Sequence, residues 1–285
     1  MSVADHRSVD EHYTRGDLAA SILAALRAAG KDPNHLDPAD LAPVDQFHTG
    51  GRAATLALAR LAGVGPGQSV LDVGGGIGGP GRTLAREFGC RVTVADLTAE
   101  YCRVGAMLTE RTGMVGAVDF VHADALDLPF AAGSFDVVWT QHSSMNIEGK
   151  YRLYAELRRV LRPDGRLALY EIMTGPRFPV WFPVPWARDQ SLSYLRPPAA
   201  IRELLLGLDL AELAWDDVTE TTLSAILAPP ELGSNPPAPS PLGIHLLLGE
   251  SCAAMQRNLV RNLMEGRIEI VRAVLERSKG GLSIG

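Results

Sequence analysis

The chain has 285 residues, of which 46% are hydrophobic and 21% are charged, so it is long enough to bury a sizeable core. Its net charge of −6 argues against a nucleic-acid partner, and no apolar stretch approaches the roughly 20 residues of a membrane span. The polar N-terminal segment has no signal-peptide core, and Cys90, Cys102 and Cys252 are odd in number and lack C-x-x-C spacing. We therefore expect a cytoplasmic protein that binds no membrane, no nucleic acid and no metal.

Residues 1–62 are predicted to form a helical cover at the N-terminal end. Apolar residues recur with helical spacing over 17–30 and over 52–63, and the segment between them, 35–51, is loop-like. The remaining residues, 63–285, are expected to form the main domain.

Strands and helices alternate from residue 68 to residue 172. Strands are predicted at 68–73, 90–97, 118–124, 134–143 and 166–172. Helices are predicted at 80–89, at 99–113 and within 150–165, where the helix ends in a Pro-Asp-Gly turn at 163–165. This alternation is typical of a parallel sheet that is covered by helices on both faces. The handedness of the crossovers then makes it an open, doubly wound sheet.

The composition changes after Glu171, because residues 174–243 hold most of the prolines. We predict that this segment is a lid inserted after the fifth strand. Two further strands near 210–219 and 267–277, with a helix over 249–266, complete the sheet. The predicted fold class is α/β, with a mostly parallel, Rossmann-like sheet of seven strands.

A glycine-rich turn follows the first strand. In "LDVGGGIGGPG" (71–81), Gly74, Gly76 and Gly79 match G-x-G-x-x-G, a spacing that lets a nucleotide approach the backbone. Titratable side chains lie at or just past the later strand ends: Asp96, Asp124, His142 and Glu171. Because ligands of such sheets bind at the carboxyl ends of the strands, this convergence predicts a ligand cleft there.

The acidic residues distinguish two cofactors. A nicotinamide dinucleotide would place its pyrophosphate on the glycine turn, next to Asp72, where a like charge is unfavourable. S-adenosylmethionine carries an ammonium and a sulfonium, which an acidic residue suits. Asp96 can then accept from the ribose hydroxyls and Asp124 from the adenine amino group, although both aspartates could instead cap the following helices.

Several segments together resemble the class I S-adenosylmethionine-dependent methyltransferases: "VLDVGGGIGG", "VADLT", "HADALDLPF", "FDVVWTQHSSMNI" and "ELRRVLRPDGRLALYE". Others, such as "FPVPWA", are similar to small-molecule enzymes of bacterial secondary metabolism, including sugar O-methyltransferases and sarcosine or dimethylglycine N-methyltransferases. The resemblance implies S-adenosyl-L-methionine as cofactor and residues 46–51 as a cover over its methionine end. It implies these cofactor-binding residues: Gln46, His48, Asp72, Gly74, Gly76, Gly78, Asp96, Leu97, Asp124, Ala125 and Gln141.

His142 and Glu171 are predicted to be catalytic. They end neighbouring strands, so we expect their side chains to meet in the cleft, with the carboxylate orienting the imidazole. His142 would then act as general base toward a hydroxyl acceptor. A histidine that only shapes the pocket is the competing interpretation.

Substrate contacts are expected from Met145 and from the lid aromatics Trp181, Phe182 and Trp186, although these aromatics could equally be core residues. The predicted function is methyl transfer to a small-molecule hydroxyl. N-methylation or C-methylation by positioning alone remains open, as does cofactor binding without transfer. The acceptor's identity and homo-oligomer formation also remain open.

Overall fold

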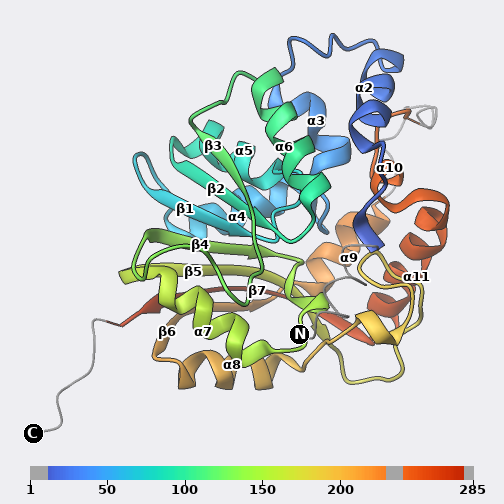
Figure 1. Cartoon of the computed structure of the whole chain (residues 1–285). Helices are drawn as coiled ribbons and strands as arrows, with labels where there is room; N and C mark the ends of the chain where they lie inside the picture. Colours follow the sequence, from blue (N-terminus) through green and yellow to red (C-terminus); the bar gives the residue numbers. More distant parts are fainter. Residues whose placement is uncertain (1–11, 229–239, 279–285) are drawn as a thin grey trace, which may run out of the picture.

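Seven strands form a sheet in the order β3-β2-β1-β4-β5-β7-β6 in a computed structural model that describes residues 12–228 and 240–278 (Figure 1). Strands β1 to β5 pair in parallel, whereas β7 runs antiparallel to both β5 and β6. The predicted mostly parallel, seven-stranded fold is confirmed. The strands are β1 (Ser69–Val73), β2 (Arg91–Asp96), β3 (Val118–His122), β4 (Phe135–Gln141), β5 (Leu161–Thr174), β6 (Leu210–Asp217) and β7 (Ile268–Arg277).

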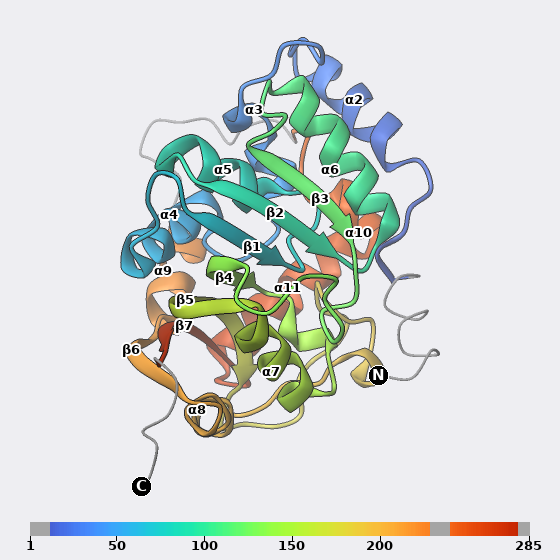
Figure 2. The same ribbon diagram turned by 60° about the vertical axis from the view of Figure 1, so that its left-hand side comes forward.

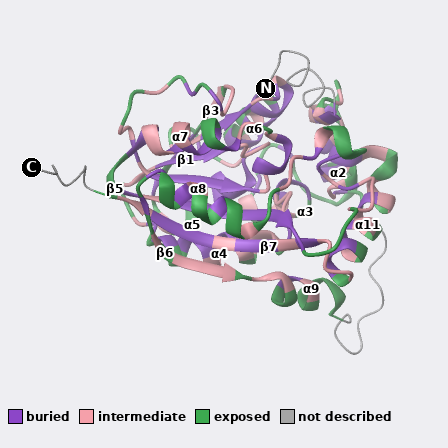
Figure 3. Cartoon of the chain, turned by 90° about the horizontal axis from the view of Figure 1, so that it is seen from below, coloured by how far each residue is buried: buried purple, intermediate pink, exposed green. Residues whose placement is uncertain are grey.

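Helices cover both faces of this sheet. The helices of the described residues are α2 (Leu18–Ala28), α3 (Pro38–Asp45), α4 (Gly51–Ala62), α5 (Gly79–Phe88), α6 (Ala99–Arg111), α7 (Lys150–Val160), α8 (Pro198–Gly207), α9 (Thr219–Leu227), α10 (His245–Leu248) and α11 (Cys252–Met264). One core cluster joins the sheet to α4, α5 and α11, and a second joins it to α7 and α8, which lie together in Figures 1 and 2. The sheet is therefore buried on both sides, as its apolar strands require and as Figure 3 shows.

Three elements differ from the sequence prediction. The segment 35–51 contains α3, which begins with a capping box between Asp37 and Asp40 and with Pro38 at its first position. The helix expected to end in the Pro-Asp-Gly turn at 163–165 ends earlier, at Val160; within that turn Pro163 lacks an N–H and Asp164 has a left-handed φ of 60°. Residues 161–165 therefore belong to β5.

The third difference lies in the predicted lid, residues 174–243. Besides the expected strand β6, it contains the helices α8 and α9, and α8 packs on the sheet. Residues 229–239 of this segment lie outside the described residues, as do residues 1–11 of the predicted cover. Among the described helices, none has the length and apolar character that crossing a membrane requires.

The strand order places a topological switch point between β1 and β4. From β1 the chain first builds outward to β2 and β3, and it then returns to the other side of β1 with β4 and β5. The loops that leave β1 and β4 therefore diverge, and a crevice opens between them at the carboxyl ends of the strands. The cover helices α2 and α3 pack against α6 beside this crevice.

Candidate active site

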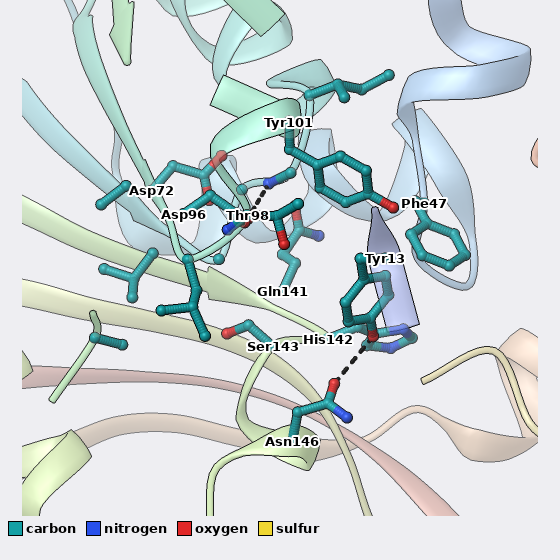
Figure 4. A pocket seen from close by; sticks show the side chains of 18 of the residues that line it. Tyr13, Phe47, Asp72, Asp96, Thr98, Tyr101, Gln141, His142, Ser143 and Asn146 are labelled. Atoms are coloured by element: carbon teal, nitrogen blue, oxygen red, sulfur yellow. Dashed lines mark hydrogen bonds between the residues drawn. The ribbon is translucent and has the colours of Figure 1, made fainter. Parts of the chain in front are cut away.

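A cleft of about 1060 Å³ lies at the carboxyl ends of β1, β2 and β4 (Figure 4). All of the predicted cofactor residues line it except Gln46 and Gly78. Figure 4 shows Asp72 and Asp96 toward one end of the cleft and His142 and Tyr13 toward the other. The cleft thus joins the glycine turn to the end of β4, as the positions at strand ends predict.

The glycine turn needs its glycines for close approach. Gly74 has a φ of 72°, and a Cβ built on it would lie 2.3 Å from the Cβ of Ser143. Gly76 has a φ of 59° and its N–H donates to Asp96 Oδ2 at 2.9 Å. The turn therefore brings β1, β2 and the residue after His142 together on one side of the cleft.

Asp96 is fixed by backbone donors. In addition to Gly76, the N–H of Thr98 donates to its Oδ1 at 2.8 Å, and the residue is 9% exposed. Each carboxylate oxygen has a second lone pair, so Asp96 can accept two further hydrogen bonds from a ligand. Asp124, after the next strand, lines the same cleft.

Asp72 is a buried carboxyl whose Oδ2 has no hydrogen-bond partner within the described residues. Burial, with a smaller contribution from the Asp96 charge, raises the pKa of Asp72 to about 7. Ionising this buried carboxyl is therefore costly, and a cation beside it would offset that cost. The ammonium of S-adenosylmethionine fits this position, whereas a pyrophosphate does not.

Two more buried polar atoms line the cleft without a partner among the described residues: Gln141 Nε2 and Tyr101 OH. The Gln141 amide has a defined orientation, because its Oε1 accepts from Trp139 Nε1 at 3.0 Å and from Thr55 Oγ1 at 3.1 Å. Its NH₂ therefore remains a donor for an oxygen of a bound molecule. Such unsatisfied groups are rare in folded proteins, and here three of them, with Asp72 Oδ2, line one cleft and are available to a polar ligand.

A second cavity of about 720 Å³ adjoins the first. Four residues line both cavities: Tyr13, Phe47, His48 and His142. Two of the predicted substrate residues, Met145 and Trp186, also line the second cavity. His142 therefore lies at the junction between a cleft that suits a cofactor and a cavity that could hold an acceptor.

His142 is a half-buried, neutral imidazole. It has a left-handed φ of 50°, and its ring stacks on Tyr170 with 5.3 Å between ring centroids. Its Nε2 lies 3.3 Å from Thr49 Oγ1, which donates to Tyr170 OH at 3.4 Å. Burial, helped by the neighbouring His48, holds the pKa of His142 well below its ordinary value. The imidazole is therefore unprotonated at neutral pH.

The prediction that Glu171 meets His142 is wrong. Side chains alternate along a strand, and because Tyr170 faces His142, Glu171 points to the opposite face of β5. Its carboxylate is fully buried and accepts from Thr140 Oγ1 at 2.6 Å and from Ser144 Oγ at 2.9 Å. Glu171 therefore anchors the turn after His142 and does not touch the imidazole.

Four other predicted residues lie apart from the cavity expected for them. Trp181 and Phe182 line neither cavity, and Trp181 Nε1 instead donates to Glu265 Oε2 at 2.8 Å. Gln46 lines the second cavity rather than the cofactor cleft. Gly78, with a φ of 82°, serves as the N-cap of α5 and lies against Phe120.

Sequence reasoning missed two residues of the site. Tyr13 and Tyr101 line the cofactor cleft, but Tyr13 precedes the predicted helices of the cover and Tyr101 occupies an apolar position of α6. Phe47 also lines the cleft and belongs to the segment 46–51 that is expected to cover the cofactor. The tyrosine beside Glu171 could have been found, because period-two alternation on β5 puts one of these two residues on the face of His142. Which face that is depends on the register between β4 and β5.

Comparisons with known proteins agree with this geometry. A family model described as a methyltransferase domain matches residues 71–169. Methyltransferase GfsG of Streptomyces halstedii is 32% identical over 232 residues, which cover 78% of this chain and 79% of that protein. Sterol methyltransferase-like 1 of Botryococcus braunii is 36% identical over 121 residues, and this match covers 42% of the chain but spans only 31% of the relative.

Solved structures share the fold. Geranyl diphosphate C-methyltransferase from Streptomyces coelicolor A3(2), in complex with Mg²⁺, geranyl diphosphate and S-adenosyl-L-homocysteine, superposes with a TM-score of 0.68. Its sequence is 19% identical, and the superposition covers 97% of this chain and 98% of that one. The sequence similarity along most of the chain, the matching family model and the seven-stranded sheet lead to one assignment: the chain belongs to the class I S-adenosylmethionine-dependent methyltransferases.

Proposed function

We propose that the protein transfers the methyl group of S-adenosylmethionine to a hydroxyl of a small molecule, with His142 as general base. The observation that carries the proposal is the position of His142, a neutral imidazole at the junction of the two cavities. When bound, the cofactor supplies a methyl group that is already activated by its sulfonium. The protein then has to align the acceptor and take up one proton.

The cofactor cleft would hold the cofactor through three acidic side chains. Asp72 suits the ammonium, and Asp96, already fixed by two backbone N–H groups, suits the ribose hydroxyls. Asp124 suits the adenine amino group. Held by these residues, the cofactor would present its methyl end to the junction, and such positioning supplies on the order of 7–11 kcal/mol in comparable reactions.

The hydroxyl network around His142 supports its role as base. Because Thr49 Oγ1 donates to Tyr170 OH, it is free to accept from a proton on His142 Nε2. That tautomer leaves the lone pair on Nδ1, which would take the proton of the acceptor hydroxyl. The lowered pKa keeps this lone pair available at neutral pH, and base catalysis of this kind contributes typically 10²–10⁴-fold.

The test uses the purified protein with methyl-labelled S-adenosylmethionine and a panel of hydroxylated, amine and prenyl metabolites, with products identified by mass spectrometry. For the hydroxyl acceptor found, His142→Ala should lower kcat by roughly 10²–10⁴. The acid limb of kcat/KM should lie below pH 6.5, because the pKa of His142 is lowered. The affinity for S-adenosylhomocysteine should stay nearly unchanged, which controls for folding.

Near-normal turnover in His142→Ala would contradict the role as base. Methyl transfer to an amine or carbon atom alone would contradict the hydroxyl acceptor. In both cases the main contribution of the protein would be to position the acceptor.

A further inference from the structure

Among the residues that the structure describes, those that line the second cavity carry no formal charge. Of the described residues that line it, eight are large apolar or aromatic residues or proline: Phe47, Met145, Ile172, Pro185, Trp186, Ile226, Ile244 and Leu259. The polar ones are tyrosine, threonine, glutamine and histidine. Burial lowers the pKa of His48 to about 4 and that of His142 well below its ordinary value, so both imidazoles are neutral.

Three of these polar side chains already bind groups that lie outside the lining. Tyr13 OH donates to Asn146 Oδ1 at 3.0 Å, and Gln46 Nε2 donates to Thr83 Oγ1 at 3.3 Å. His48 Nε2 lies 3.0 Å from the carbonyl oxygen of Gly51, an acceptor, so this nitrogen carries the proton. The lining therefore offers a ligand few polar contacts, chiefly the lone pairs of the two imidazoles.

Two charged residues that adjoin the lining in the chain, Asp45 and Glu171, have partners away from the cavity. Asp45, next to Gln46 in the chain, is in a buried ion pair with Arg82, whose Nη2 lies 2.9 Å from its Oδ2. Glu171, next to Ile172, faces the other side of β5. An anionic or cationic acceptor would consequently enter this cavity without a counter-charge from the lining, and burying an unpaired ion costs many kcal/mol.

The apolar wall of the cavity disfavours the smallest metabolites as ligands. The space of about 720 Å³ that it borders includes a part open to solvent. An acceptor of only a few heavy atoms would leave most of the apolar wall in contact with water. A larger apolar body would bury it.

We propose that the second cavity is the acceptor site and that it takes an uncharged, mainly apolar alcohol rather than a phosphate ester, a carboxylate or an ammonium compound. This inference rests on the proposed function and adds the class of acceptor to it. The hydroxyl would point toward the junction at His142, and the apolar body would lie between Ile172, Trp186 and Leu259.

The experiment compares ligands of one shape and different charge. Protein saturated with S-adenosylhomocysteine is titrated by calorimetry with octan-1-ol, octanoate and octylammonium, and with geraniol and geranyl diphosphate. Octan-1-ol should bind with a Kd below about 1 mM, as expected for a ligand of this size. Its Kd should be at least tenfold lower than those of octanoate and octylammonium, and geraniol should bind at least tenfold more tightly than its diphosphate.

A variant with a positive charge in the cavity wall is expected to favour the anionic ligand. Gln256→Lys places an ammonium in the cavity wall and should tighten octanoate binding at least tenfold while weakening octylammonium. Ala253→Lys adds the same charge to the exposed face of the same helix, α11, and should change neither affinity by more than about twofold.

The inference is overturned if octan-1-ol does not bind, if a charged ligand binds as tightly as its neutral counterpart, or if both lysine variants act alike. S-adenosylhomocysteine binding is measured first and separately. Its failure would contradict the proposed cofactor site, whereas failure of the alcohols alone contradicts only the class of acceptor.

Discussion

At the residue scale, Asp72 shows how a binding group can oppose folding. Its pKa is raised to about 7 by burial, so the folded, ligand-free protein binds this proton more tightly than the unfolded chain does. The ionised carboxylate therefore lowers the free energy of unfolding. This loss of stability is absent below about pH 4, where Asp72 is protonated in both the folded and the unfolded protein, and it reaches its full size above pH 7. A bound ammonium would remove this cost, which links stability to function.

This argument predicts opposite effects of Asp72→Asn on stability and binding. At pH 8 the variant should raise the free energy of unfolding of the ligand-free protein by on the order of 1–3 kcal/mol, and at pH 4.5 by much less. At pH 8 it should weaken S-adenosylhomocysteine binding at least tenfold. Binding to the unchanged protein should also weaken below pH 7, approaching tenfold per pH unit, as Asp72 becomes protonated. Urea unfolding and calorimetry measure these quantities.

Asp119→Asn, an exposed position on β3, is the matched control and should change neither quantity appreciably. If Asp72→Asn binds S-adenosylhomocysteine normally, Asp72 does not hold the ammonium.

At the scale of elements, the turn after β4 connects the two cavities. Residues 143–147 include Met145 in the second cavity and Asn146 in the first. Lys150 Nζ donates to the carbonyl oxygens of Ser144 and Ile147, the latter at 2.7 Å, and Glu171 accepts from the side chains of Thr140 and Ser144. The buried carboxylate of Glu171 and the buried ammonium of Lys150 together fix the backbone and side chains of this turn. We therefore assign Glu171 a positioning role.

The predicted effect of Glu171→Gln follows from that role. An amide has one acceptor oxygen where the carboxylate has two, and it leaves the buried Lys150 without a nearby negative charge. The free energy of unfolding should fall by about 1–3 kcal/mol. The acid limb of kcat/KM should stay at the same pH, because Glu171 does not touch His142. A shift of that limb would restore the orienting role that the sequence suggested, and Glu203→Gln, exposed on α8, serves as the stability control.

Much of the site could be predicted from the sequence because strand ends are easily located. Gly74, Asp96, Asp124 and His142 follow apolar strands, and a parallel sheet brings all strand ends of one direction to one edge. The direction of a side chain depends on register, which the sequence does not show. For this reason the sequence predicts a contact between His142 and Glu171, whereas in the structure His142 stacks on Tyr170.

The lid aromatics show the same difficulty for irregular segments. Trp181 and Trp186 are five residues apart in a proline-rich stretch without periodicity. Trp186 is buried and lines the second cavity, whereas Trp181 packs under Arg261, whose guanidinium lies 4.0 Å from the centre of its ring. The two tryptophans have different roles because α11 packs beside Trp181 and not because of any difference in the local sequence.

At the scale of the whole molecule, the sequence predicts the order of the strands and helices of the sheet domain. It does not predict which helices of that domain the cover packs against. Apolar side chains of α2 and α3 share a core cluster with Tyr101, Val104 and Leu108 of α6. Gly79 lets α3 approach α5, because a Cβ there would lie 2.1 Å from the carbonyl oxygen of Asp45. These contacts join segments far apart in sequence and leave no local pattern. We propose that the cover and the sheet domain, though distinct in sequence, unfold together.

The ion pair between Asp45 and Arg82 provides the test of this proposal. Both side chains are at most 1% exposed, and Arg82 also donates to the carbonyl oxygen of Ile77 at 2.7 Å and to Thr109 Oγ1 at 3.0 Å. Asp45→Ala would leave a buried guanidinium without a counter-charge, and we expect a loss of about 3–5 kcal/mol in the free energy of unfolding. Asp45→Leu combined with Arg82→Met removes both charges and should recover most of that loss.

Two probes report the two parts of the molecule separately. The four tryptophans lie between residues 139 and 215, so their fluorescence follows the sheet domain, and hydrogen exchange of peptides from 18–45 follows the cover. If the parts unfold as one unit, Asp45→Ala lowers both opening free energies by the same amount. A cover that opens at its own lower free energy, with the tryptophan transition unmoved by Asp45→Ala, would instead make residues 1–62 an independent unit. In that case the loss of the ion pair would weaken S-adenosylhomocysteine binding without weakening the sheet, because α3 carries Asp45 at the edge of the cofactor cleft.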